Sequence, residues 1–285
     1  MLMRFLHSLF GGPVAADNAP GDATGFPVDD LRNRIRLFEG APIGSHLEIL
    51  YRDCRIGPLE FLPLYRDCLA RSETSVSAWK SFIRVQSALN LAHYYLHALT
   101  IPGKRIECGV FRGFSALRVC EVARAAADRP GGYAGEDLHL VDSFAGFPEP
   151  LEQDFIAMRD RSHAVSGAAF HAGDGAAPEE HLRTLLAGFP HVTIHKGWIP
   201  AVYSSLPESL WSFVHIDVDL YEATLTSLQY FYPRMSPGGV IVCDDYGSTL
   251  FPGARTAWDE FCDSAGLSFI VLETGQAVLL NGSAP

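Results

Sequence analysis

The feature that most constrains the fold is a regular alternation of short apolar runs with helical stretches, which starts at residue 104 and continues to the C-terminus. Helical stretches are expected at about 114–128, 178–188, 221–233 and 253–264. Parallel strands need a crossover that returns the chain, and a helix commonly makes it. The alternation therefore predicts an α/β sheet whose apolar, strand-like runs are 104–110, 137–143, 191–196, 211–218, 238–243, 268–273 and 276–281.

The last two runs differ from the others because only Thr274 and Gly275 separate them. So short a connection allows a hairpin but not a helical crossover. We therefore expect a Rossmann-like, mostly parallel sheet of seven strands with an antiparallel last strand.

The remainder of the chain divides into three parts. The opening stretch MLMRFLHSLF is short and interrupted by His7, which is atypical of a signal peptide, and we expect a flexible segment over 1–27. A helical extension is expected over 28–100, with its clearest helix at 75–99, followed by a catalytic domain over 101–285. Residues 150–177 are predicted to form an irregular loop or lid.

Composition narrows the function classes. The chain has 22 Lys and Arg against 33 Asp and Glu, a net charge of −11, which disfavours binding to nucleic-acid phosphates. No apolar run approaches the ~18 residues that a membrane span needs. The six cysteines include no Cys-x-x-Cys pair, so we expect reduced thiols in a cytoplasmic protein rather than a zinc or dithiol site.

The first candidate site is the turn Glu107-Cys-Gly109-Val-Phe-Arg-Gly113-Phe-Ser115, between an apolar run and a helix. Glycines let a backbone turn tightly and pass close to a ligand, and a helix start presents unpaired N–H groups. The acid at the strand end suits a cationic ligand, such as an amino group, better than a diphosphate. An ordinary strand-to-helix turn would have the same glycines.

The second candidate is Asp142-Ser143, at the end of the next run. Nucleotide-binding sheets hold ribose hydroxyls with an acid at this place, because a carboxylate can accept both hydrogen bonds. A solvated carboxylate at a strand end is the alternative, but two acids at consecutive strand ends favour a site.

Further acids follow two later runs, as Asp217-Val-Asp219 and as Asp244-Asp245. Alternation places His215, Asp217 and Asp219 on one face of their strand. If the two strands are neighbours, Asp217, Asp244 and Asp245 meet, and such a cluster repels itself unless a hard divalent ion such as Mg²⁺ binds it. Solvated acids at a sheet edge remain the alternative for each pair alone.

These motifs, in this order, resemble the macrocin O-methyltransferase family of natural-product sugar methylation. The match covers about 104 to 265, with Glu-x-Gly-Val-x-Arg-Gly, Asp-Ser-Phe-x-Gly, Asp-x-Asp-Leu-Tyr-Glu and Gly-Gly…Asp-Asp-Tyr-Gly. The resemblance implies a class I methyltransferase fold, S-adenosylmethionine, Mg²⁺, a small-molecule hydroxyl acceptor and a homo-oligomer. It also implies that Asp217, Asp244 and Asp245 bind the metal and that Asp217 is the base, with Asp219 as a second catalytic candidate.

On this hypothesis the Glu107 turn, with Ser115, holds the methionine part of the cofactor, and Asp142 with Ser143 holds the ribose. Gly197-Trp198, after the third run, is the expected adenine contact, although Trp198 fits a core position equally well. Val218 and Phe114 depart from the family pattern.

Three alternatives stay open at this point. The hydroxyl could belong to a catechol, phenol or polyketide instead of a sugar. Asp217-Val-Asp219 also resembles the Asp-x-Asp of metal-dependent glycosyltransferases that use nucleotide-sugars, which would leave Glu107 and Asp244-Asp245 without roles. A scaffold protein with a methyltransferase-like fold is the third alternative, and the intact set of acids argues against it.

Overall fold

The structure, a computed structural model, describes residues 58–73, 81–127, 137–159, 164–167 and 170–282. The predicted flexible segment 1–27 and the first part of the predicted extension lie outside these residues.

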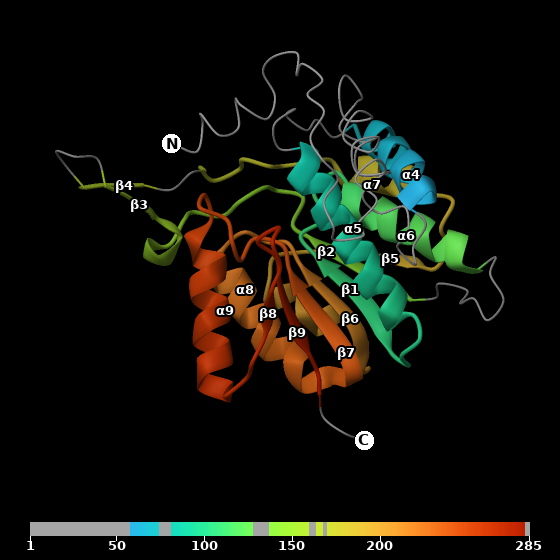
Figure 1. Cartoon of the computed structure of the whole chain (residues 1–285). Helices are drawn as coiled ribbons and strands as arrows, with labels where there is room; N and C mark the ends of the chain where they lie inside the picture. The colour runs from blue at the N-terminus through green and yellow to red at the C-terminus, as the bar shows by residue number, and fades with distance from the viewer. Residues whose placement is uncertain (1–57, 74–80, 128–136, 160–163, 168–169, 283–285) are drawn as a thin grey trace, which may run out of the picture. The chain divides into compact units, whose positions relative to one another are not determined.

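A seven-stranded sheet forms the centre of the described chain (Figure 1). Its spatial order is β5-β2-β1-β6-β7-β9-β8, in which β9 pairs antiparallel with both β7 and β8. The prediction of a mostly parallel sheet with a reversed last strand is therefore confirmed. The strands are β1 (Lys104–Cys108), β2 (Leu138–Asp142), β5 (Val192–Lys196), β6 (Trp211–Ile216), β7 (Met235–Cys243), β8 (Ile270–Val271) and β9 (Ala277–Leu280).

Helices cover both faces of the sheet (Figure 1). One layer contains α4 (Pro58–Arg71), α5 (Ser81–Ala98), α6 (Phe114–Ala127) and α7 (Glu179–Leu185). The other contains α8 (Tyr221–Phe231) and α9 (Pro252–Ala265). Short 3₁₀ turns occur at Glu152–Asp154 (η1), Ala201–Ser205 (η2) and Tyr232–Arg234 (η3).

Alternate residues of the central strands build the two cores. In β7, Ile241 faces the cluster with α8 and α9, whereas Val240 and Val242 face the cluster with α5 and α6. In β6, Val214 and Phe213 divide in the same way. This is the period of two that a pleated strand imposes, and covering both faces explains why most residues of these strands are apolar. Since α5 shares a core with β6 and β7, this helix belongs to the layers of the sheet.

The structure departs from the sequence expectation in two places. The predicted loop 150–177 contains a two-stranded antiparallel hairpin, β3 (Ile156–Arg159) with β4 (Ala164–Gly167), besides η1. Strands of four residues are too short to give a periodic signal. In addition, β6 ends at Ile216, two residues before the predicted end at 218, so Asp219 lies in a loop with φ 62°. The expectation that alternation carries Asp219 on the same strand face as His215 is therefore wrong.

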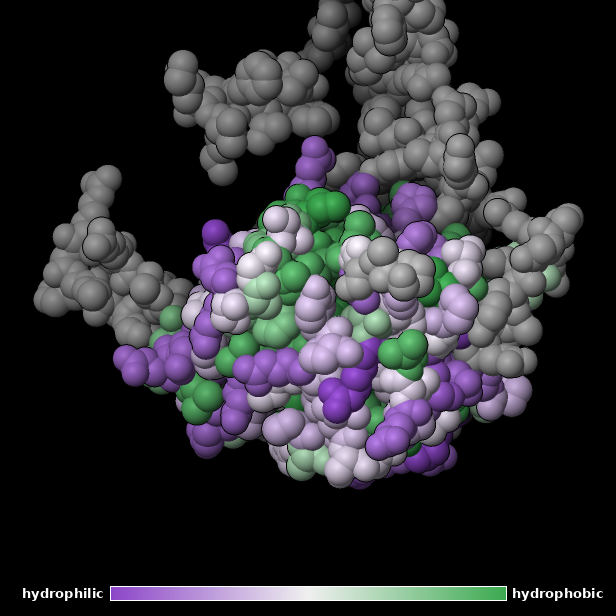
Figure 2. All heavy atoms as spheres, turned by 90° about the horizontal axis from the view of Figure 1, so that it is seen from below, coloured by the Kyte–Doolittle hydropathy of each residue, from purple (hydrophilic) through white to green (hydrophobic). Residues whose placement is uncertain are grey.

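Two further observations concern the described residues alone. The five described cysteines are free and buried. Within the described ranges, no helix combines the length and apolar character needed to cross a membrane. Figure 2 views the molecule from below relative to Figure 1 and shows a patch of apolar residues with polar residues on several sides of it.

Candidate active site

A cavity of about 510 Å³ lies at the edge of the sheet where the parallel strands end. In open α/β sheets, ligands bind at this edge because the loops that follow the strands converge there. All five parallel strands that precede β8 contribute residues from their carboxyl ends. From β1, β2, β5, β6 and β7 in turn, these include Gly109, Asp142, Gly197, Asp217 and Asp244.

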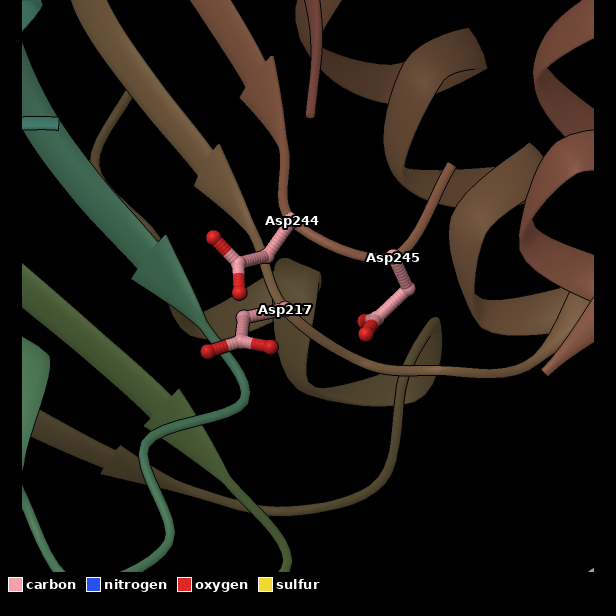
Figure 3. Close-up of side chains that lie close together, drawn as sticks. All are labelled: Asp217, Asp244 and Asp245. Atoms are coloured by element: carbon pink, nitrogen blue, oxygen red, sulfur yellow. The ribbon is translucent and has the colours of Figure 1, made fainter. Parts of the chain in front are cut away.

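Three of the predicted acids meet in this cavity. One carboxylate oxygen each of Asp217, Asp244 and Asp245 lies within 4.8 Å of the other two. Figure 3 shows the three side chains pointing toward one shared space, Asp217 from the end of β6 and the other two from the end of β7. Backbone hydrogen bonds from Asp217 N to Cys108 O (2.9 Å) and from Asp244 N to Ile216 O (3.0 Å) extend the strand pairing to this point. The sheet itself therefore sets the spacing of the acids.

The acids of this cluster lack enough positive charge around them. Burial and the neighbouring carboxylates raise the pKa of Asp217 well above its usual value. Burial and the carboxylates of Asp219 and Asp244 do the same to the pKa of Asp245. Burial and the charge of Asp217 raise the pKa of Asp219 to about 8. The carboxylates therefore disfavour one another's ionisation, and a bound cation would offset this repulsion.

The residues present fit a hard divalent ion. The Oδ2 atom of Asp245 is buried and has no hydrogen-bond partner among the described residues. A buried polar atom without a partner costs free energy, and a bound cation would remove that cost. Carboxylate oxygens are the ligands that Mg²⁺ prefers.

A buried histidine, His215, lies behind the cluster. It is 1% exposed, and its Nδ1 lies 3.7 Å from Glu107 Oε2 while its Nε2 lies 3.7 Å from Asp244 Oδ1. Burial lowers the pKa of His215, but the carboxylates of Asp244 and Glu107 outweigh burial and raise this pKa to about 10. Burial likewise raises the pKa of Asp244, yet His215 and the amide of Gln276 bring it below its usual value. The sequence placed His215 on the same strand face as Asp217 without giving it a function.

Glu107 does not reach the cavity. It is 1% exposed, and its Oε1 accepts a hydrogen bond from Ser115 Oγ at the start of α6. Gly113 is not among the residues that line the cavity, and a Cβ there would come within 2.4 Å of Leu182 Cδ1 in α7. Glu107, Gly113 and Ser115 are therefore in position to support the turn, whereas the sequence suggested direct contact with a ligand.

Gly109 does line the cavity, and its requirement for glycine comes from the protein. A Cβ at this position would lie 1.9 Å from the carbonyl oxygen of Asp217, and the residue has φ 83°. A side chain would therefore push β6 away from β1 and displace Asp217.

Asp142 lines the cavity and is already well supplied with hydrogen bonds. Its Oδ2 accepts from Val110 N and Phe111 N, both at 2.8 Å, and its Oδ1 accepts from Phe144 N at 2.7 Å. The neighbouring Ser143 Oγ accepts from Ala145 N at 3.1 Å. A carboxylate has about four acceptor positions, so three bonds leave about one for a ligand. Asp142 thus joins the loops that follow β1 and β2.

Trp198 is not a core residue. It is 46% exposed and lines the cavity together with Gly197, whose N–H donates to Asp142 O at 2.9 Å. The structure thus excludes the core position that the sequence left open, and the exposed indole offers an apolar face at the cavity wall.

Several cavity residues were not recognised in the sequence. Arg84 of α5 lines the cavity, as does the buried Asp154, whose Oδ1 accepts from Tyr221 N at 2.8 Å. An aromatic cluster borders the same space, with ring centroids of Phe147 4.6 Å from Phe170 and 5.8 Å from Phe251. These residues come from α5, from η1 and from loops, and no periodic pattern in the sequence marks them as cavity residues. The one available signal was that Phe147 lies close in sequence to the Asp142-Ser143 motif.

Sequence comparison identifies relatives. A model of the family described as macrocin-O-methyltransferase matches residues 84–274. The 8-demethyl-8-(2,3-dimethoxy-alpha-L-rhamnosyl)-tetracenomycin-C 4'-O-methyltransferase of Streptomyces olivaceus is 31% identical over 151 residues, which cover 51% of this chain and 54% of the relative. The mycinamicin III 3''-O-methyltransferase of Micromonospora griseorubida is 28% identical over 187 residues, 65% of this chain and 70% of the relative. The chain thus spans about half the length of the first relative.

Solved structures share the fold. The calicheamicin methyltransferase CalS11 superposes with a TM-score of 0.58 at 17% identity, over 95% of this chain and 100% of that one. The O-methyltransferase NovP superposes with a TM-score of 0.54 at 22% identity, over 71% of this chain and 81% of that one.

Proposed function

The chain belongs to the macrocin-O-methyltransferase family, and on that premise we propose that it methylates a hydroxyl of a small molecule with S-adenosylmethionine as donor and Mg²⁺ as cofactor. The observation that carries this proposal is the convergence of Asp217, Asp244 and Asp245 at one edge of a 510 Å³ cavity. Cavities of this size are typical of small-molecule sites. The alternative of a nucleotide-sugar glycosyltransferase gains no support from the family match.

We propose that five predicted residues contact the methyl donor directly, because they line the cavity at the ends of β1, β2 and β5. These are Gly109, Asp142, Ser143, Gly197 and Trp198. We assign Glu107, Gly113 and Ser115 a supporting role instead, since Glu107 is buried against Ser115 and His215.

The proposed chemistry rests on Asp217 and Asp219. Methyl transfer is an in-line displacement, so holding the acceptor oxygen near the methyl carbon is a large part of catalysis. A divalent ion held by Asp217, Asp244 and Asp245 would lower the pKa of a coordinated hydroxyl. Asp217, the proposed base, and Asp219 beside it both line the cavity, so these carboxylates are in place to accept the proton of the hydroxyl.

We propose that the acceptor is a sugar hydroxyl in a molecule with an apolar body. Phe147 and Phe251 of the aromatic cluster line the cavity, as do Leu151 and Leu250, and the buried Phe170 packs against both rings. Such a wall can bury an apolar aglycone. The relatives from Streptomyces olivaceus and Micromonospora griseorubida, which are named for methylation of a rhamnosyl tetracenomycin and of mycinamicin III, support a glycoside acceptor.

The test is methyl transfer from isotope-labelled S-adenosylmethionine to a panel of deoxysugar glycosides, their free aglycones and catechols, followed by mass spectrometry. Each reaction is run with Mg²⁺ and with a chelator. We expect labelled glycoside that disappears with the chelator. Label on catechols or aglycones alone would contradict the sugar acceptor, and label that survives chelation would contradict the metal mechanism.

A further inference from the structure

Gln276 is a buried residue beside the acidic cluster that the proposed mechanism does not use. It is 1% exposed and lies immediately before β9. The first residue of β9, Ala277, pairs with Cys243, the last residue of β7. Because β9 runs antiparallel to β7, its first residue lies at the edge where the parallel strands end (Figure 1). The reversed strand thereby brings Gln276 next to Asp244.

The amide of Gln276 makes four hydrogen bonds. Its Nε2 donates to Asp244 Oδ1 at 2.7 Å and to Ser87 O at 3.4 Å. Its Oε1 accepts from Thr274 Oγ1 at 2.9 Å and from Asn90 Nδ2 at 3.2 Å. These bonds use both donors and both acceptor positions of the amide, so its orientation is determined. A flipped amide would direct Oε1 at the carboxylate of Asp244.

Two of the four partners of Gln276 come from α5. Asn90 and Ser87 both belong to this helix, and Asn90 Nδ2 also lies 3.3 Å from Thr274 Oγ1. The helix packs against β6 and β7 through buried side chains such as Leu91 and Tyr95. Asn90 of α5 is therefore hydrogen-bonded to Gln276, which in turn is hydrogen-bonded to Asp244.

A neutral amide has a particular advantage at this place. Asp244 has to stay anionic and correctly oriented among carboxylates that repel it. An N–H donor on Oδ1 fixes the plane of the carboxylate and adds no charge that would compete with a cation. Partners of this kind, one shell outside the ligands, commonly set metal affinity.

We propose that Gln276 is the positioning residue of Asp244 and that Asn90 of α5 orients Gln276, so that this pair sets the affinity of the acidic cluster for a divalent cation. The inference rests on the proposed function, because it requires that Asp217, Asp244 and Asp245 bind the ion. It extends the site to two residues that touch neither the acceptor nor the methyl donor.

The test is a titration of the protein with Mn²⁺, in which electron paramagnetic resonance measures the free ion. Gln276→Leu removes both donors at similar volume, and we expect Mn²⁺ affinity to fall about 10- to 100-fold. Asn90→Ala leaves Thr274 in place to orient the amide, and we expect about a threefold loss. Affinity for S-adenosylhomocysteine, measured by calorimetry without metal, should stay within twofold in both variants.

The matched control is Asn281→Leu. Asn281 is a buried amide just past the other end of β9, where its Nδ2 donates to Met235 O at 3.0 Å and to Ser236 O at 3.2 Å. This change should lower the unfolding temperature and leave Mn²⁺ affinity unaltered. If Mn²⁺ affinity falls in Gln276→Leu but not in Asn281→Leu, the cause is the lost contact with Asp244 and not the loss of a buried amide in general.

The outcomes are distinguishable. If the wild type binds Mn²⁺ and Gln276→Leu binds it equally well, the positioning role is wrong while the proposed function stands. If the wild type binds no Mn²⁺, the metal part of the proposed function fails and this inference fails with it. If Gln276→Leu does not fold, Gln276→Met and Asn90→Ala take its place, and unchanged Mn²⁺ affinity in both would overturn the proposal.

Discussion

Asp142 and Asp245 are both acids at strand ends in one site, but their hydrogen-bond surroundings differ. Asp142, after β2, accepts three backbone hydrogen bonds at 2.7–2.8 Å and joins two loops. Asp245, after β7, has a buried oxygen without a hydrogen-bond partner among the described residues and lies between other acids. Backbone N–H groups satisfy the first carboxylate, whereas one oxygen of the second has no such donor, which is why we propose that a cation binds there. An acid at a strand end is therefore a structural support or a ligand site according to the N–H groups that face it.

The largest expected effect tests the acidic cluster that we propose binds a cation. Asp217→Ala removes a carboxylate that is both a proposed metal ligand and a proposed catalytic group, and we expect turnover to fall about 10³-fold or more. Affinity for S-adenosylhomocysteine should change less than twofold. Glu222→Gln, an exposed carboxylate that lines the same cavity, is the control and should keep turnover within about threefold. Near-normal turnover in Asp217→Ala would remove this residue from its role.

The second effect tests the role of Asp142 as a support for the neighbouring loops. Asp142→Ala leaves the N–H groups of Val110, Phe111 and Phe144 without their acceptor, and we expect affinity for S-adenosylhomocysteine to fall about tenfold or more, because each lost charged acceptor is worth about 1.5–3 kcal/mol. Isothermal titration calorimetry measures the change. Asp245→Asn should bind the same ligand within twofold of the wild type. Equal affinities for S-adenosylhomocysteine in the two variants would contradict the different roles that we assign to Asp142 and Asp245.

Substitutions of Asp142 and Asp245 should change the free energy of unfolding in opposite directions. In metal-free protein at pH 8, Asp142→Asn should lower the free energy of unfolding by about 1–3 kcal/mol, since one oxygen cannot serve all three N–H groups. Asp245→Asn should raise this free energy by about 1 kcal/mol, because it removes a charge from a self-repelling cluster. Denaturant unfolding monitored by circular dichroism gives both values. A decrease in both variants would show that Asp245 is satisfied without a cation.

The last expected effect concerns pH. The folded-state pKa values of Asp219 (about 8) and His215 (about 10) lie above those of the unfolded chain, so these groups bind protons more tightly when folded. The stability that this tighter proton binding supplies is lost as pH rises toward these values. The metal-free protein should therefore lose stability between pH 6.5 and 9. Mg²⁺ binds the deprotonated carboxylates, so the increase in unfolding temperature that it causes should be larger at pH 9 than at pH 6.5.

A second histidine limits the pH range of this measurement. His139 lies 2.8 Å from His195 between Nδ1 and Nε2, and burial and the charge of His195 lower the pKa of His139 to about 4. A lowered folded pKa gives stability that is complete above the unfolded value of about 6.5 and is lost as pH falls toward 4. Staying above pH 6.5 therefore excludes His139. An equal Mg²⁺ effect at pH 6.5 and pH 9 would contradict the electrostatic account of the cluster.

The positions of the acids could be predicted because a parallel sheet brings its carboxyl ends together. Once the apolar runs were recognised as strands, Asp142, Asp217 and Asp244 had to lie along one edge. The contacts of Glu107 could not be predicted in this way. Whether a strand-end acid faces a cavity or a buried serine depends on the direction of its side chain relative to a neighbouring helix, which the sequence pattern does not encode.

The residues that escaped prediction come from elements without periodicity or from distant parts of the chain. The aromatic cluster combines Phe147, Phe170 and Phe251, and several strands and helices lie between the last two of them in the chain. Gln276 reaches Asp244 across 32 positions, and Asn90 reaches Gln276 across 186. Contacts at such separations arise from the order and direction of the strands, and no local pattern reports them.

The sequence by itself determined the alternation of strands and helices, the reversal of the last strand and the identity of the acids at the strand ends. Local physics dictates all three, through the period of apolar residues, the shortness of the 274–275 turn and the placement of charge after apolar runs. Only the tertiary structure decided that backbone N–H groups satisfy Asp142, that Trp198 lines the cavity and that Gln276 holds Asp244. These outcomes depend on which groups face one another after packing, because a buried carboxylate is stable only with the donors or the cation that its surroundings provide.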